Sequence, residues 1–360
     1  MSTTKKSPSL NEAVSSELKK GFDLNKFKDK KLLNSNVKFK EQKWIPVSEA
    51  VQEALGVPGI PMGHITLLRG HSNAGKTTAL IEAAVSAQKA GILPVFIITE
   101  MKWSWEHLKQ MGFKLEDVKD EQGNIVNHTG FFIYTDRTAL QTIEDVAAFI
   151  VDLLDEQKKG NLPYDLLFMW DSIGSIPCKM SVEANKNNAQ WNAGAMSQQF
   201  GNFVNQKIVM SRKENQPYTN TLLCTNKIWV SPPENPFAQP KMKNKGGETM
   251  FSDASLVLTF GNITNSGTAK IKAVKDKKEV EFALKSKVAS DKNHVNGITT
   301  KGTLVATVHG FIKDSPTTID KYKKEHSKDW VSTLGSSDFS LIEDTSEWEE
   351  TNSIPYLGEE

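Results

Sequence analysis

One octapeptide carries the strongest chemical signal in this sequence. Residues 70–77 read GHSNAGKT and match the pattern G-x-x-x-x-G-K-[ST], between a short apolar run and an alanine-rich helical pattern. In such a loop backbone N–H groups point at phosphate oxygens, and the helix N-terminus adds partial positive charge. Lys76 would reach the β- and γ-phosphates, and Thr77 would bring its hydroxyl to Mg²⁺. The predicted nucleotide contacts in this loop are Gly70, Ser72, Asn73, Ala74, Gly75, Lys76, Thr77 and Thr78.

Two carboxylates follow apolar runs elsewhere in the chain. Asp171 comes directly after residues 166–170, and Glu100 comes directly after residues 92–99. Ligands bind in open α/β sheets at the carboxyl ends of the strands, so both side chains should face the nucleotide. Asp171 is then the second Mg²⁺ ligand, and Glu100 orients or deprotonates the attacking water. The alternatives are an ordinary turn aspartate and a solvated loop glutamate.

Alternating patterns predict the elements that position these residues. Nearly continuous apolar runs are typical of strands that are buried on both faces, and residues at i, i+3 and i+4 indicate helices. Later apolar runs are interrupted by polar residues and resemble antiparallel or edge strands. This order predicts an α/β domain with a mostly parallel central sheet covered by helices. The predicted strands are 64–69, 92–99, 130–135, 166–170 and 221–225, the helices 77–90 and 140–154, and the later strands 254–260, 270–274, 280–288 and 303–308.

Composition narrows the class of protein. At 360 residues, 38% hydrophobic and 24% charged, the chain can form one large domain with appendages, which excludes a wholly disordered or collagen-like chain. The two cysteines, Cys178 and Cys224, form no C-x-x-C pair, so neither a disulfide framework nor a zinc ribbon is expected. No apolar stretch approaches 18 residues, and we expect an unexported protein in a reducing cytoplasm.

The two ends of the chain differ in charge, although the net charge is only +1. Residues 1–40 contain ten lysines and four acids, whereas the chain after Lys328 contains nine acids and neither lysine nor arginine. Such ends can bind different partners or each other, or can be solvated and disordered. We expect the acidic tail to lack fixed structure. The expected divisions are a basic segment at 1–44, a core at 45–312 and a C-terminal segment at 313–360.

With these motifs the chain resembles the RecA/Rad51 recombinase family. The lead-in at residues 54–63, with its G-x-P-x-G, resembles the segment before the family's phosphate-loop strand. Glu100 matches the catalytic glutamate, Asp171 and Ser172 match the Walker B pair, and residues 195–198 resemble the helix after the first DNA loop. The resemblance covers about residues 45–312 and implies a RecA-like ATPase core. The lysine-rich, arginine-poor composition is similar to the phage UvsX branch.

Two departures from the family pattern concern the nucleotide sensor and the second strand. Asn226 and Lys227 stand where the resemblance places a γ-phosphate sensor, and Lys227 replaces the glutamine of bacterial members. An ammonium would then couple nucleotide state to DNA binding. The motif at residues 98–100 also lacks the acid that often precedes the glutamate by two positions.

The resemblance implies two DNA-binding loops, at residues 178–193 and 229–247. The second combines lysines at alternate positions, an aromatic residue and paired glycines, which suits a surface that follows phosphates and contacts bases. A disordered insertion is the alternative explanation of this long polar segment. The expected DNA contacts are Lys179, Lys186, Trp191, Phe237, Lys241, Lys243, Lys245, Gly246 and Gly247.

Two lysines fall where the bacterial branch places cations that reach the neighbouring protomer's γ-phosphate. Lys285 and Lys287 are two residues apart on a predicted strand and therefore share a face. The resemblance assigns them to catalysis with Lys76 and Glu100. By pattern alone, a solvated strand face explains them at least as well.

The sequence thus predicts a DNA-dependent ATPase that uses ATP and Mg²⁺. The resemblance implies helical filaments on single-stranded DNA and homologous pairing with double-stranded DNA, in the host cytoplasm if a phage encodes the chain. The acidic tail would contact a loading or single-strand-binding partner. A RecA-fold ring helicase or motor, and a nucleotide-binding recombination mediator without strand exchange, are the alternatives.

Overall fold

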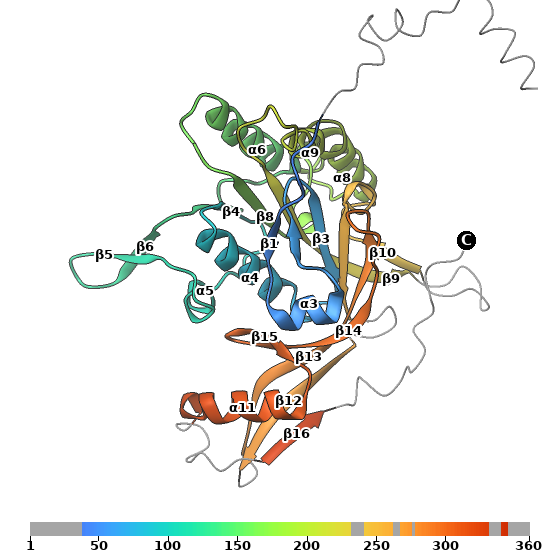
Figure 1. Ribbon diagram of the computed structural model, residues 1–360. Helices are drawn as coiled ribbons and strands as arrows, with labels where there is room; N and C mark the ends of the chain where they lie inside the picture. Colours follow the sequence, from blue (N-terminus) through green and yellow to red (C-terminus); the bar gives the residue numbers. More distant parts are fainter. Residues whose placement is uncertain (1–37, 232–240, 262–266, 276–277, 331–339, 345–360) are drawn as a thin grey trace, which may run out of the picture. The chain divides into compact units, whose positions relative to one another are not determined.

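Parallel strands form the middle of a twelve-stranded sheet in the computed structural model, which describes residues 38–231, 241–261, 267–275, 278–330 and 340–344 (Figure 1). Along the sheet the parallel strands follow the order β11-β3-β9-β8-β4-β7. The expected mostly parallel sheet is therefore confirmed. These strands are β3 (Ile65–Gly70), β4 (Leu93–Ile98), β7 (Ile133–Asp136), β8 (Leu166–Asp171), β9 (Thr221–Ser231) and β11 (Leu256–Phe260).

The contacts divide the chain into two units, Met1–Lys40 with Lys213–Asn215 and Glu41–Arg212 with Gln216–Glu360. Within the described residues of the first unit, Phe39 and Lys213 form an antiparallel bridge. The sheet and every other element named below belong to the second unit.

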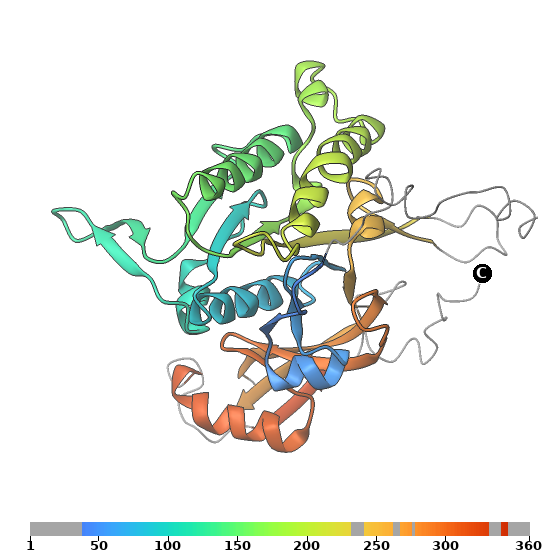
Figure 2. The ribbon, with the colours of Figure 1, turned by 45° about the horizontal axis from the view of Figure 1, so that its top comes forward.

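Alternation along the parallel strands builds a core on each face of the sheet. In β8, Leu167 and Met169 join the core under α4 (Lys76–Lys89), whereas Phe168 and Trp170 join the core under α6 (Ile143–Lys158). Successive side chains of a strand point to opposite faces, so burial on both faces requires an uninterrupted apolar run. Figure 2 shows α6 and the helices after it on one side of the sheet and α4 on the other.

The polar stretch after β8 folds into short helices. The first are η1 (Ile173–Ser175) and α7 (Lys179–Glu183). A helical run then covers α8 (Ala189–Met196), the π-helix η2 (Ser197–Val204) and α9 (Asn205–Met210), as the match at residues 195–198 predicts. Asn188 caps α8 by accepting hydrogen bonds from the backbone of residues 190 and 191.

The second half of the sheet is antiparallel. β13 (Lys278–Asn293) pairs with β11, β12 (Thr268–Lys275) and β14 (Lys301–Thr307), and β14 pairs with β15 (Gly310–Lys313). β11 was predicted as an antiparallel or edge strand. It is antiparallel to β13 on one side but parallel to β3 on the other, and so lies inside the sheet and not at its edge. Helix α11 (Pro316–His326) contributes Ile319 and Tyr322 to a third core with side chains of β12, β13 and β14.

Part of the acidic C-terminal segment is also structured, contrary to the expectation. Its backbone forms β16 (Ser340–Asp344), which pairs antiparallel with β12. An edge strand leaves a row of backbone N–H and C=O groups unpaired, and β16 forms hydrogen bonds with such groups of β12. The rest of that tail, residues 345–360, lies outside the described residues.

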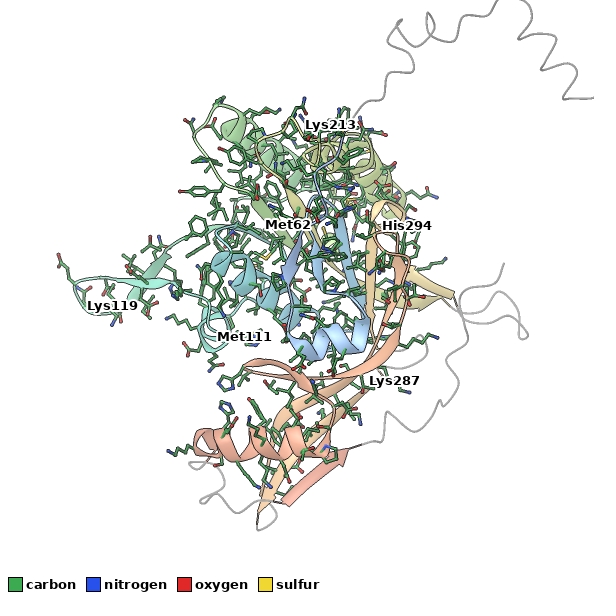
Figure 3. The ribbon with its side chains drawn as sticks, in the orientation of Figure 1. Met62, Met111, Lys119, Lys213, Lys287 and His294 are labelled. Atoms are coloured by element: carbon green, nitrogen blue, oxygen red, sulfur yellow. The ribbon has the colours of Figure 1, made fainter. Side chains whose placement is uncertain are left out.

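The strands β5 and β6 form a hairpin that the sequence patterns did not reveal. It lies between α5 and β7 in the sequence and projects from the side of the sheet in Figure 1, and Figure 3 labels Lys119 on it. Its inward side is stabilised by Asp117, which binds Lys109 of α5 at 2.7 Å and His128 at 2.9 Å. The remaining elements are β1 (Trp44–Pro46), α3 (Glu49–Leu55), β2 (Gly59–Pro61), α5 (Trp105–Gln110), β5 (Glu116–Lys119), β6 (Ile125–Thr129), β10 (Lys241–Asn244), α10 (Thr249–Asp253) and η3 (Ser327–Trp330).

Candidate functional site

The phosphate loop begins where β3 ends and finishes at the first residue of α4. Gly70 has a φ of 151°, and a Cβ there would lie 2.0 Å from the backbone oxygen of Phe260 on β11. Only glycine fits that close approach. Gly75, with a φ of 97°, is the N-cap of α4, so the loop enters the helix with its N–H groups exposed toward a bound anion.

Lys76 is buried at the start of α4, with 8% of its surface exposed. Its ammonium donates hydrogen bonds to the backbone oxygens of Gly70 (3.1 Å) and His71. Burial lowers the pKa of Lys76 to about 8, although Asp171 opposes that shift. The cation is thus held among the loop carbonyls and is poorly solvated, which strengthens its attraction to a phosphate.

The two predicted Mg²⁺ ligands are in direct contact. Thr77 Oγ1 donates to Asp171 Oδ2 at 3.1 Å, and Thr225 on β9 donates to Asp171 Oδ1. Burial raises the pKa of Asp171, and it outweighs the hydrogen bonds from Thr225 and Thr77, which lower that pKa. Hydroxyl and carboxylate oxygens are hard ligands of the kind that Mg²⁺ prefers, so Thr77 and Asp171 fit a magnesium ion that also binds nucleotide phosphates.

Glu100 lies beside Asp171 because β4 and β8 are neighbours that run parallel. Its carboxylate accepts a hydrogen bond from Ser172 Oγ at 3.3 Å and forms an ion pair with Lys227 at 2.6 Å. Burial would raise the pKa of Glu100, but the Lys227 ammonium outweighs it and holds that pKa below its ordinary value. The predicted catalytic base and the predicted sensor are therefore bound to each other.

A pocket of about 860 Å³ opens from this loop. It is lined by residues 73–78, by α5 residues that include His107 and Gln110, by residues of β13 and β14 that include Leu284 and Thr307, and by Val308 just after β14. Triphosphate and base of one nucleotide could both contact this lining.

Three aromatic residues follow Glu100 in the sequence, and only one of them lines that pocket. Trp103 and Trp105 pack against Phe96 in the core, with ring centroids at 5.1 Å and 6.4 Å. His107 lines the pocket, and its buried Nε2 has no hydrogen-bond partner among the described residues. Burial, with the nearby His309 ring, lowers the pKa of His107, which favours its neutral imidazole form.

The sensor segment connects the nucleotide pocket to the second predicted DNA loop. Lys227 accepts the backbone N–H of Lys245 at 3.1 Å, and Asn226 Nδ2 donates to the backbone oxygen of Lys245 at 2.9 Å. The buried Asn226 Oδ1 has no partner within the described part of the chain. The backbone of Lys227, whose side chain binds Glu100, is therefore hydrogen-bonded to the backbone of Lys245.

The two predicted DNA loops meet at one groove of about 510 Å³. Lys186 of the first loop and Lys245 and Gly246 of the second line it. Gly247 has a φ of 97°, and a Cβ there would lie 2.9 Å from Cβ of Ala193, so glycine permits the loops to touch. The second loop is a hairpin at its base, because β10 pairs antiparallel with β9.

The other predicted DNA contacts lie away from that groove or beyond the described positions. Lys179 forms an ion pair with Asp145 at 3.7 Å, and Trp191 packs against the core under α6. Lys243 is exposed and lies 5.8 Å from the Trp229 ring, on the hairpin. The backbone of Lys241 belongs to β10, and Phe237 lies outside the described residues.

The two lysines assigned to a neighbouring protomer's site occupy β13 and are absent from the lining of the nucleotide pocket. Lys285 forms an ion pair with Asp314 at 3.2 Å, and its side chain is 16% exposed. Figure 3 labels Lys287 on β13 and Met111 at the end of α5, on different sides of the view. Within one protomer, these lysines do not line the pocket that holds Lys76.

The groove also contains a residue that the sequence analysis missed. Arg137, which follows β7, lines it together with Lys186 and Lys245. Two signals were available, because Arg137 is one of only three arginines and follows a predicted strand. Neither signal is specific to DNA binding, and no motif includes Arg137, so the sequence did not indicate a role for it.

Two features are absent from the described residues, a membrane-spanning helix and a cluster of metal ligands. None of the helices there is long and apolar enough to cross a membrane. No three His, Cys, Asp or Glu side chains there converge on a metal position, so a magnesium ion would depend on Thr77, Asp171 and the nucleotide itself.

Comparisons with known proteins point to one family. The sequence model of the RecA N-terminal domain matches residues 23–150, a stretch that includes the phosphate loop and Glu100. Protein RecA of Mycoplasma pneumoniae is 35% identical over 116 residues, which are 31% of this chain and 34% of that protein. Protein RecA of Streptomyces coelicolor is 37% identical over 71 residues, which are 20% of this chain and 19% of that protein. Protein RecA of Tropheryma whipplei is 31% identical over 107 residues, which are 29% of this chain and 24% of that protein.

These alignments span about a third or less of the length of the curated relatives. The family-model match at residues 23–150 includes the phosphate loop, the parallel strands β3, β4 and β7, and Glu100. The resemblance inferred from the motifs is thereby confirmed, because residues 23–150 match the RecA N-terminal domain and the chain is similar to RecA proteins.

Proposed function

We propose that this chain is an ATP-dependent DNA recombinase, which assembles on single-stranded DNA, hydrolyses ATP to ADP and phosphate, and promotes homologous pairing and strand exchange. The observation that carries the proposal is the connection of two sites at one edge of the sheet. The nucleotide pocket contains Lys76, the groove contains Lys245, and Lys227 contacts both Glu100 and the Lys245 backbone. A chain that only bound nucleotide would not need this connection.

The residues around the triphosphate have separable roles. Lys76 binds the β- and γ-phosphate oxygens, and the loop N–H groups bind the remaining oxygens. Thr77 and Asp171 would hold Mg²⁺, which when bound neutralises charge on the phosphates. Glu100, released from Lys227, orients the attacking water and accepts its proton as the bond to the γ-phosphorus forms. The neutral His107 ring stacks on the base.

ATP acts in this proposal as a conformational ligand as well as a substrate. A γ-phosphate attracts the Lys227 ammonium away from Glu100, because three phosphate oxygens carry more negative charge than one carboxylate. The backbone oxygen of Lys227 accepts the N–H of Lys245, so movement of Lys227 would shift the Lys245 backbone and change the DNA groove. DNA binding at the groove would favour the same displacement, since coupling between two sites is reciprocal. Lys285 and Lys287 would reach the γ-phosphate of the adjacent protomer in a filament.

The first test is the ATPase rate with and without oligo(dT), together with electron microscopy in a slowly hydrolysed ATP analogue. We expect DNA-stimulated hydrolysis, helical filaments and exchange of a homologous strand. Lys76→Ala should abolish hydrolysis, whereas Lys89→Ala, which removes an exposed lysine at the far end of α4, should not. A Lys76→Ala rate within twofold of wild type would refute the assignment.

The same images separate the alternative functions. Closed rings that unwind duplex DNA would replace the proposal by a ring motor. Nucleotide binding without filaments, rings or strand exchange would replace it by a mediator.

A further inference from the structure

One wall of the DNA groove comes from neither of the two predicted loops. The turn after β7 contributes Arg137, and the opposite sides contribute Lys186 and Lys245. Strand β7 is the last parallel strand and lies next to β4, which ends at Ile98, two residues before Glu100. The groove therefore reaches from the loops to the edge of the catalytic sheet.

The backbone at Arg137 is fixed, while its side chain is exposed. Its N–H donates to the backbone oxygen of Ile98 at 3.1 Å, which continues the pairing of β7 with β4. The neighbouring carboxylate of Asp136 is already occupied, because it accepts hydrogen bonds from the Thr138 N–H at 2.8 Å and the Tyr134 hydroxyl at 3.3 Å. Arg137 forms no ion pair with any carboxylate among the described residues.

Charge in the groove has a single sign. The ionisable residues in its lining are Arg137, Lys186 and Lys245, and the lining contains no aspartate or glutamate. Elsewhere lysines are commonly paired, as Lys109 is with Asp117 and Lys158 is with Asp155 at 2.8 Å. Three cations from three separate elements, without a neutralising acid, create a positive field that attracts an extended polyanion.

We propose that Arg137 binds a backbone phosphate of the single-stranded DNA in this groove, as a contact outside the two loops. The inference rests on the proposed function and extends its DNA site. A guanidinium can donate two parallel N–H bonds to one phosphate, which an ammonium cannot. Arginine at this position therefore fixes the orientation of the strand, beyond adding charge.

The same groove contains a hydrogen-bonded path to the active site. Ser175 lines the groove, and its hydroxyl donates to Thr99 Oγ1 at 2.6 Å, next to Glu100. A phosphate held by Arg137 would thus lie in a groove that is hydrogen-bonded, through Ser175 and Thr99, to the segment that carries Glu100. Loss of Arg137 should consequently weaken DNA-stimulated hydrolysis along with DNA binding.

The test measures the Kd of a fluorescent oligo(dT) by anisotropy over a salt series, with a slowly hydrolysed ATP analogue present. Each phosphate neutralised on a single strand contributes about −0.7 to the slope of log K against log salt. We expect Arg137→Ala to make the slope less negative by about 0.7 and to weaken binding. Arg137→Lys should keep the wild-type slope, because the charge remains, but should bind more weakly than wild type.

Lys89→Ala removes one positive charge outside the groove and is the matched control. If Arg137→Ala keeps the slope and Kd of this control, the inference is overturned. Loss of ATP-analogue binding by both Arg137→Ala and Arg137→Lys would also overturn it, since the residue would then be structural. A wild-type chain that binds no oligonucleotide would instead contradict the proposed function itself.

Discussion

The ammonium of Lys227 lies 2.6 Å from a carboxylate oxygen of Glu100, across 127 positions of sequence. The pair joins β9 to the end of β4, over the intervening strand β8. A carboxylate that is bound to an ammonium accepts a proton poorly, because the ion pair stabilises its charged form. The arrangement therefore favours a protein that hydrolyses ATP slowly until Lys227 moves.

The first prediction concerns that ion pair. Lys227→Gln keeps a polar side chain but removes the charge, so the pKa of Glu100 should rise and its basicity should recover. We expect the DNA-free ATPase rate to increase several-fold and the ratio of DNA-stimulated to DNA-free rate to fall. Both rates can be measured by phosphate release at saturating ATP.

Lys102→Gln is the matched control for this prediction. Lys102 also lowers the pKa of Glu100, but it is exposed and forms no ion pair with it among the described contacts. Its removal should leave both rates close to wild type. A DNA-free rate of Lys227→Gln at or below that of Lys102→Gln would contradict the brake and favour a purely activating Lys227.

The second prediction concerns pH. Because burial lowers the pKa of Lys76 to about 8, half of the free protein has a neutral Lys76 at that pH. ATP prefers the charged form, so binding above pH 8 must be accompanied by proton uptake, and affinity should fall by up to about tenfold per pH unit. Calorimetry at pH 8.5 in two buffers of different ionisation enthalpy measures the uptake directly. No uptake there, with unchanged affinity between pH 7 and 9, would show that Lys76 remains charged.

The third prediction concerns the base. Removing a stacked aromatic ring costs about 1–3 kcal/mol, so His107→Ala should raise the Kd of ATP by about fivefold or more, and His107→Phe should retain most of the affinity. Inorganic tripolyphosphate has no base and is the control ligand. If His107→Ala weakens tripolyphosphate as much as ATP, the residue acts on the loop and not on the base.

The fourth prediction concerns the lysines of β13. If they act on a neighbouring protomer, a Lys285→Ala/Lys287→Ala chain should bind nucleotide normally and lose DNA-stimulated hydrolysis. Mixing it with Lys76→Ala chains should restore part of the rate, because some mixed interfaces combine an intact loop with intact lysines. Asp314→Asn, which frees Lys285 from its ion pair, should not reduce the rate. Co-assembled mixtures that show no rescue at any ratio would argue against a shared site.

The fifth prediction concerns stability. The hydroxyl of Thr99 accepts hydrogen bonds from Trp170 Nε1 at 2.9 Å and from Ser175 at 2.6 Å. Thr99→Val leaves the buried indole N–H unpaired and should lower the free energy of unfolding by about 1–3 kcal/mol. Thr66→Val is the matched control, because the Thr66 hydroxyl is equally buried but has no partner among the described residues. Chemical denaturation that shows equal losses for both variants would refute the role of this hydrogen bond.

The sequence by itself determined the parallel half of the fold and the nucleotide loop. Both are set by local rules, since a strand buried on two faces must be apolar throughout, as residues 166–170 are. A phosphate loop likewise needs its glycines and Lys76 at fixed spacing. Asp171 and Glu100 could be placed for the same reason, because the carboxyl ends of neighbouring parallel strands meet at one edge.

Only the tertiary structure decided which side chains meet across that edge. The ion pair of Lys227 with Glu100 depends on the order β9-β8-β4, which no local pattern encodes. The run at 254–260 resembled an antiparallel or edge strand, yet β11 is paired on both sides, antiparallel with β13 and parallel with β3. Trp105 and His107 are both aromatic residues of one helix, but the packing of Phe96 takes the tryptophan inward and leaves the histidine at the pocket.

The groove is the clearest case of this division. Lys186 and Lys245 belong to loops that the family resemblance had singled out, whereas Arg137 comes from a different part of the chain and carries no motif. A groove lined by three elements forms only when their backbones pack against each other, as Gly247 and Ala193 do. The free energy of such packing depends on residues that are distant in sequence. For that reason only the folded structure shows which residues line the groove.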